Sequence, residues 1–142
     1  RAHADAALEL DPGLIINGDF SAEAGVRGIT HLLETDLAFT AIFAANDMTA
    51  FGANLELQRR GIRIPEDVSL VGFDDQAESA YMIPPLTSVH QPATEMGSHA
   101  AEMIMQLIAG KDVSSIKLHG ELMHRESVSK RTQTGAHNVG LK

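Results

Sequence analysis

The sequence predicts an α/β fold with a doubly wound, mainly parallel sheet and flanking helices. Apolar stretches of strand length alternate with amphipathic stretches of helix length along the 142 residues, as in βαβ units. Several apolar runs are continuous, which is typical of strands covered on both faces. With 44% hydrophobic residues, the chain can build the core of one domain of this size.

The first strand is expected at residues 14–16, a short apolar run after the turn-forming residues 11–13. A helix from Ser21 to about Glu34 follows, because apolar residues recur at helical spacing after a residue type that often caps helices. Residues 41–45 form a continuous apolar run and are predicted to be a strand buried on both faces. These three segments make the first βαβ unit.

The second helix is expected to be capped by Asp47, to carry cations near its carboxyl end and to stop at Gly61. Residues 68–73 form a third apolar run, which ends in Asp74 and Asp75. Two carboxylates are therefore expected at the carboxyl end of a buried strand.

The second half of the chain continues the alternation. Residues 87–91 are predicted to be a strand, residues 96–108 carry a helical apolar stripe that ends at Gly110, and residues 117–128 are predicted to be the last strand. The tail from Ser129 has almost no apolar content and contains two glycines, so it is predicted to be disordered.

Charge and composition argue against several classes of function. Nineteen acidic and eleven basic side chains give a net charge of -8, which repels a phosphate backbone, so DNA binding by this segment is not expected. No apolar run reaches the roughly 18 to 20 residues of a membrane span, and no secretion signal is recognised. The absence of cysteine excludes disulfides and fits a reducing compartment. A cytoplasmic protein without a membrane partner is expected.

Polar side chains gather where the predicted strands end. In open α/β sheets, ligands bind outside the carboxyl ends of the strands. The residues at those ends are carboxylates, amides and one aromatic ring: Asp19, Phe20, Asn46, Asp47, Asp74, Asp75 and Gln91. Carboxylates and amides hydrogen-bond hydroxyl groups, and an aromatic face covers the C–H surface of a sugar ring. This edge of the sheet is therefore predicted to bind a small polyhydroxylated ligand.

Three consecutive motifs carry a resemblance to a known family. They read AIFAANDMTAFGA at residues 41–53, RGIRIPEDVSLVGFDD at residues 60–75 and PPLTSVHQP at residues 84–92. In this order and spacing they resemble signatures of the LacI/GalR family of transcription regulators. Residues 121–127 (ELMHRES) resemble the final strand of that family, and the whole match runs over about residues 18–128.

The resemblance implies a two-lobed effector-binding core similar to that of periplasmic sugar-binding proteins. Residues 1–128 would form part of it, mainly the second lobe, with a strand and a helix within about residues 87–117 crossing into the first lobe. The family's helix-turn-helix DNA-binding domain and most of the first lobe are not in this sequence. Operator DNA would thus be reached only through that missing amino-terminal domain.

Four ligand-binding residues are implied by the same resemblance. The family's ligand aromatic falls on Phe20, its strand-end amide on Asn46, its hydroxyl-binding carboxylate on Asp74 and a hinge-side amide on Gln91. Phe20 suits a sugar ring or a purine equally well, so the identity of the effector stays open. A small sugar-like molecule is the expected class.

Self-association is implied as well, as a homodimer or a higher homo-oligomer. The contacts are expected on Met48, Tyr81, Met82 and Ile83, here called the dimer face. The apolar loop that contains the last three residues could also serve another interaction partner.

Two further alternatives are an enzyme and a sugar-binding protein of a transport system. An enzyme is disfavoured because no catalytic motif is present and because Asp74 and Asp75 diverge from adjacent strand positions; Asp75 and Asp47 are expected to be caps. His119 and His124 face opposite sides of a predicted strand, so no metal site and no cofactor are expected. The transport protein is disfavoured by the missing secretion signal and by the sequence of residues 60–75.

Overall fold

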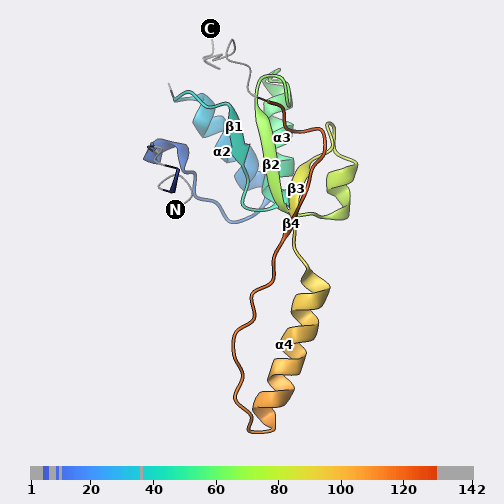
Figure 1. Ribbon diagram of the computed structural model, residues 1–142. Coiled ribbons are helices and arrows are strands. Elements are labelled where there is room, and N and C mark those ends of the chain that lie inside the picture. Colours follow the sequence, from blue (N-terminus) through green and yellow to red (C-terminus); the bar gives the residue numbers. More distant parts are fainter. Residues whose placement is uncertain (1–4, 7–8, 10, 36, 131–142) are drawn as a thin grey trace.

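The computed structural model describes residues 5–6, 9, 11–35 and 37–130 (Figure 1). Its elements follow one another as the 3-10 helix η1 (Pro12–Leu14), α2 (Ala22–Leu33), β1 (Ala41–Phe43), α3 (Asp47–Arg59), β2 (Ser69–Asp74), the 3-10 helix η2 (Ala77–Ala80), β3 (Thr87–His90), α4 (Ala93–Ile108) and β4 (Glu121–Met123).

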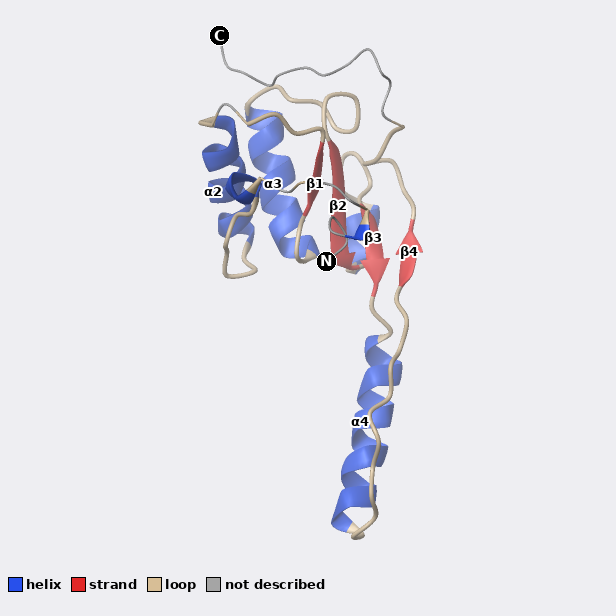
Figure 2. Cartoon of the chain, turned by 60° about the vertical axis from the view of Figure 1, so that its left-hand side comes forward, coloured by secondary structure: helices blue, strands red, loops and turns tan. Residues whose placement is uncertain are grey.

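The four strands form one open sheet in the order β1-β2-β3-β4 (Figure 2). β1 pairs in parallel with β2, and β2 pairs in parallel with β3, so the carboxyl ends of all three strands point the same way. β4 runs antiparallel to β3. The predicted α/β class with a mainly parallel sheet is confirmed.

The core lies between the helix pair α2 and α3 and the sheet. Ile29 and Leu33 contribute from α2, Ala53 and Leu57 from α3, and Leu70 from β2, and each of these side chains is buried. The helical apolar stripe predicted after Ser21 is therefore the face that α2 buries. Burying such a face contributes most of the stability of a short amphipathic helix.

Side chains close the amino ends of both helices. Ser21 Oγ accepts a hydrogen bond from the backbone N–H of Ala24 at 3.0 Å and caps α2, as predicted. α3 is capped by Asn46, whose Oδ1 accepts from the N–H of Thr49 at 2.9 Å, so the prediction of Asp47 as the cap is wrong by one residue. The helix stops where Gly61 adopts a φ of 72°, a region that glycine enters without a steric penalty.

Two glycines let α2 and α3 approach each other closely. A Cβ added to Gly52 would lie 1.8 Å from the carbonyl oxygen of Ala22, and one added to Gly25 would lie 2.1 Å from that of Thr49. Both contacts involve backbone atoms, which cannot move aside as a flexible side chain can. The short distance between α2 and α3 is therefore possible only because neither of these two positions carries a side chain.

The predicted strand at residues 14–16 is not formed. Pro12 opens η1 and Asp11 Oδ1 accepts from the N–H of Gly13 at 2.8 Å, so a local turn takes up the backbone of this segment. Ile15 remains 56% exposed after it. β1 is also less covered than predicted, since Phe43 is 67% exposed instead of buried.

The carboxyl-terminal segment is held mainly by side chains. β4 spans only Glu121–Met123 of the strand predicted at residues 117–128. Beyond it, Ser127 Oγ donates to the carbonyl of Leu70 at 2.6 Å and accepts from the N–H of Thr87 at 2.8 Å. Ser129 still donates its N–H to Ser69 Oγ, so order extends past the predicted start of the tail, and residues 131–142 lie outside the described residues.

Helix α4 extends away from the sheet beside the returning segment that leads to β4 (Figures 1 and 2). None of its residues is buried, and its apolar residues Met96, Ile104 and Leu107 are 46%, 56% and 60% exposed. It ends near Gly110, as predicted, where φ is 71°. No described helix is long and apolar enough to cross a membrane.

We predict that Gly52→Ala destabilises the chain by about 3 kcal/mol, because the new methyl group has no space beside Ala22. Gly97→Ala in α4 is the matched control, since nothing lies within 4 Å of its added Cβ. That substitution should stabilise the chain by roughly 0.5 to 1 kcal/mol through helix propensity. Thermal unfolding followed by circular dichroism distinguishes the two, and equal effects would contradict the close contact.

Candidate functional site

The carboxyl ends of β2 and β3 bring two predicted ligand residues into contact. Asp74 pairs with His90 in the sheet register, and Gln91 follows directly. Gln91 Nε2 donates to Asp74 Oδ1 at 3.0 Å. Both side chains are partly exposed, so a carboxylate and an amide lie next to each other at an accessible strand end.

The backbone at this strand end is turned sharply. Asp74 has a φ of 109° and Asp75 a φ of 58°, both in the left-handed region that residues other than glycine rarely adopt. Such conformations cost about 1 to 3 kcal/mol each and persist where neighbouring contacts impose them. The sharp turn lets the two adjacent carboxylates point to different partners: Asp74 contacts Gln91, and Asp75 contacts Arg125.

The pKa of Asp74 is raised above its ordinary value of 3.8. The main cause is burial, which disfavours the charged form, and the second is the negative charge of Asp47. A group that donates hydrogen bonds to Asp74, as a ligand hydroxyl does, favours the ionised form and opposes this shift.

Phe20 and Asn46 form the second pair of predicted residues. Asn46 Nδ2 donates to the carbonyl oxygen of Phe20 at 3.0 Å, while its Oδ1 caps α3. The Phe20 side chain is 63% exposed and its φ is 64°. Asp19 directly precedes Phe20, and hydrogen bonds from Ser21 lower the pKa of the Asp19 carboxyl group. Asn46 thus anchors the loop that presents the Phe20 ring, a contact that the strand-end position alone did not reveal.

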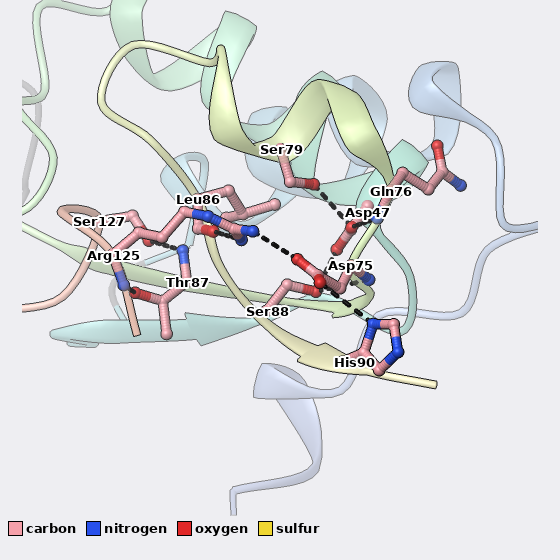
Figure 3. A network of polar contacts seen from close by, with 10 residues as sticks. All are labelled: Asp47, Asp75, Gln76, Ser79, Leu86, Thr87, Ser88, His90, Arg125 and Ser127. Carbon is pink, nitrogen blue, oxygen red and sulfur yellow. Dashed lines mark hydrogen bonds and ion pairs between the residues drawn. The ribbon is translucent and has the colours of Figure 1, made fainter. Parts of the chain in front are cut away.

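The sequence did not reveal the contacts of Asp47. Its side chain has no exposed surface and accepts hydrogen bonds from the N–H of Gln76 at 2.8 Å, Ser79 Oγ at 2.6 Å and Ser88 Oγ at 2.6 Å (Figure 3). The three donors come from the residue before η2, from η2 itself and from β3. Asp47 is therefore an interior acceptor, and the expected role as a helix cap is wrong.

The role expected for Asp75 is also wrong. Its Oδ1 accepts from Arg125 Nη2 at 2.6 Å, and its Oδ2 lies 3.1 Å from His90 Nδ1 (Figure 3). Arg125 also donates to the carbonyl of Leu86 at 2.7 Å. The ion pair of Asp75 with Arg125 joins residues fifty positions apart in the sequence, so only the tertiary fold could reveal it.

The dimer face is largely accessible. Tyr81 is 85%, Ile83 79% and Met48 40% exposed, and Met82 is half-buried against the core. A hollow of about 410 Å³ is lined by Met48, Phe51, Gln76, Glu78, Tyr81 and Met82. Apolar residues from the start of α3 and from the loop after η2 thus lie side by side, as the prediction of a shared contact requires.

His119 and His124 belong to no cluster that could hold a metal ion. Within the part of the chain that the structure describes, no group of three or more histidine, aspartate or glutamate side chains has that arrangement.

The sequence profile of the periplasmic binding protein-like domain matches residues 2–128. This chain belongs to that family. Among its relatives, the repressor PurR of Aliivibrio fischeri is 38% identical over 135 residues, which cover 92% of this chain and 40% of PurR. The chain therefore spans less than half of that regulator.

Two solved structures give the same result for the fold. The Escherichia coli repressor AscG has a TM-score of 0.78 at 38% identity, over 89% of this chain and 46% of AscG. The regulator CelR, solved in complex with cellobiose, has a TM-score of 0.82 at 37% identity, over 89% of this chain and 39% of CelR. The resemblance to LacI/GalR-type regulators seen in the motifs is thus confirmed, since this chain matches part of the core of such regulators in sequence and in fold. All of these relatives are transcriptional regulators, so the comparisons favour a regulator over the sugar-binding protein of a transport system.

We predict that Asp75→Ala destabilises this domain by about 2 to 4 kcal/mol, because it leaves Arg125 without its carboxylate partner in a largely buried position. Glu66→Ala, at an exposed position, is the control and should change stability by less than about 0.5 kcal/mol. Chemical unfolding measures both. An Asp75 variant as stable as the Glu66 variant would show that the ion pair makes no net contribution.

Asp74→Asn should make the domain more stable at neutral pH, with the gain disappearing on acidification. The pKa of Asp74 is higher in the folded state than in the unfolded chain, so ionised Asp74 lowers the stability of the fold when the pH lies above both pKa values. This loss of stability disappears as the pH falls through the raised pKa toward 3.8, because Asp74 is then protonated in the folded state. Asparagine removes the charge and retains an acceptor for Gln91. Melting temperatures at several pH values between 7 and 4 test this, and a variant less stable than the wild type at neutral pH would contradict it.

Proposed function

We propose that this chain is the effector-binding and dimerisation part of a LacI/GalR-type transcription regulator and that it binds a small sugar-like ligand. The observation that carries the proposal is the contact between Asp74 and Gln91 at the carboxyl ends of adjacent parallel strands. Ligands of open α/β sheets bind at this position. The exposed ring of Phe20 and its anchor Asn46 support the same site.

The chemistry of these groups favours a polyhydroxylated molecule. Ligand hydroxyls donate to the Asp74 carboxylate, and the Gln91 amide can both donate and accept. The flat face of Phe20 covers the C–H surface of a sugar ring. The relative CelR was solved with cellobiose, which supports a sugar as the class of ligand.

The missing part of the regulator is proposed to supply the opposite wall of the site. An apolar hollow of about 520 Å³ lies between the sheet, α4 and the returning segment, and Phe73, Val89, Met103 and Leu118 are among the residues that line it. Together with the exposed stripe of α4, this surface supports the assignment of about residues 87–117 to the first lobe. Operator DNA would be bound by the amino-terminal domain, consistent with the charge of -8 on this segment.

The regulator is proposed to be a cytoplasmic homodimer or higher oligomer without enzymatic activity. The exposed dimer face supports self-association, because large apolar side chains such as Tyr81 and Ile83 rarely gather on a surface that meets only water. Nothing in the proposed site requires a cofactor, since effector binding uses hydrogen bonds and apolar contact alone.

Asp74→Ala in the intact regulator is predicted to weaken sugar binding by roughly ten- to a hundredfold. The lost hydrogen bonds to a charged acceptor contribute about 1.5 to 3 kcal/mol each, and 1.4 kcal/mol corresponds to a factor of ten. Calorimetric titration with the sugar that binds the wild type, found by a thermal-shift screen of sugars, sugar phosphates and nucleobases, measures the change.

Asp75→Ala is the comparison, because its side chain contacts Arg125 and His90 instead of Gln91. It should weaken sugar binding much less, provided that melting curves show a folded protein under the conditions of titration. Equal losses in the two variants, or no loss with Asp74→Ala, would overturn the assignment of the site. A wild-type protein that binds nucleobases and no sugar would overturn the proposed ligand class alone.

A further inference from the structure

We infer that Asp47 is a positioning residue that couples the sugar-binding strand ends to the dimer face. The inference rests on the proposed function, because it assigns a role within that site and that interface. It starts from an unusual feature, a carboxylate with no exposed surface that accepts three hydrogen bonds from three places in the chain.

One side of this network leads to the ligand residues. Ser88 Oγ donates to Asp47 Oδ1 at 2.6 Å and accepts from the N–H of Asp75 at 3.2 Å. Asp75 directly follows Asp74 at the strongly turned end of β2. Asp47 therefore fixes, through Ser88, the backbone that sets the direction of the Asp74 side chain. The negative charge of Asp47 also contributes to the raised pKa of Asp74.

The other side leads to the dimer face. Asp47 Oδ2 accepts from the N–H of Gln76 and from Ser79 Oγ, which fixes both ends of the short segment around η2. Ser79 in turn accepts from the N–H of Leu86 through its carbonyl at 2.8 Å and so closes the loop that contains Tyr81. Met48, another member of the dimer face, directly follows Asp47 in α3.

The space around Asp47 makes this network rigid. A Cβ added to Gly72 in β2 would lie 2.2 Å from Asp47 Oδ1, so the strand touches the carboxylate. All three partners of Asp47 are uncharged donors, and a buried carboxylate that loses such donors is strongly destabilised. A shift of β2 on ligand binding would thus be passed to η2, because Asp47 cannot give up one partner without cost.

The test compares variants of the intact regulator that cut the network with one that cuts an unrelated buried contact. Asp47→Asn replaces one acceptor oxygen by an NH2 group, which cannot accept a hydrogen bond, so at least one of the three donors loses its acceptor. Ser79→Ala removes one of the two dimer-side donors. Ser127→Ala is the control, since Ser127 is equally buried but bonds to Leu70 and Thr87. The dimer dissociation constant of each is measured by sedimentation with and without cellobiose or D-glucose.

The wild type should show a ratio of the two dissociation constants in the range of roughly 5 to 150 that is typical of allosteric coupling. Asp47→Asn and Ser79→Ala should bring that ratio to within about twofold of one, whereas Ser127→Ala should lower the melting temperature and keep the wild-type ratio. Sugar affinity, measured by calorimetry, should fall in Asp47→Asn, and in Ser79→Ala it should no longer differ between the monomer and the dimer, because the coupling is reciprocal.

Two outcomes overturn the inference alone: a sugar-binding wild type whose dimerisation does not respond to the sugar, or network variants that keep the wild-type ratio. Loss of the ratio in the Ser127 control as well would also overturn it, because general loosening of the core would then explain the effect. A wild type that binds no molecule of the thermal-shift screen, neither a sugar nor a nucleobase, contradicts the proposed function itself, and the inference falls with it.

Discussion

The carboxylate of Asp47 lies in the interior and is held by Gln76, Ser79 and Ser88 (Figure 3). Removing an ion from water costs several kcal/mol, and hydrogen bonds to the charged group, at about 1.5 to 3 kcal/mol each, are what offset that cost. These bonds are therefore obligatory, and they bring the start of α3, the segment around η2 and β3 to one point. The geometry of the strand ends depends on this constraint, because β3 and the segment after β2 both bond to the same carboxylate.

The same constraint explains why two neighbouring carboxylates behave differently. Asp74 and Asp75 leave the end of β2 with positive φ angles, and the hydrogen bond from Asp75 N–H to Ser88 helps to hold that turn. As a result Asp75 reaches Arg125 while Asp74 stays beside Gln91 at the accessible edge. One carboxylate stabilises the fold, and the other, whose pKa is raised by burial and by Asp47, remains available to donors from a ligand.

The sequence predicted what periodicity and local chemistry control. The helices α2, α3 and α4, the cap Ser21, the stop at Gly61 and the buried strand β2 follow from spacing and from residue types, and they are found within a few residues of the predicted bounds. Long-range contacts were not predictable in this way. The burial of Asp47 and the pairing of Asp75 with Arg125 join residues that no local pattern connects. The strand predicted at residues 14–16 does not form for a related reason. An apolar run becomes a strand only where a neighbouring strand pairs with it, and here the local turn at Asp11 to Gly13 takes up the start of the segment instead.

The position of Gln91 joins the two halves of the chain. It directly follows the last residue of β3 and lies two residues before the start of α4, so it connects the sheet to the segment that leads into α4. A molecule that hydrogen-bonds both Asp74 and Gln91 therefore contacts the sheet and the first residues of that segment together. Because α4 buries none of its residues within the described chain, few contacts here fix its direction relative to the sheet. A ligand bonded to Gln91 is thus next to the segment that leads into α4, whereas the turn at Asp74 and Asp75 connects the same ligand through Ser88 to Asp47.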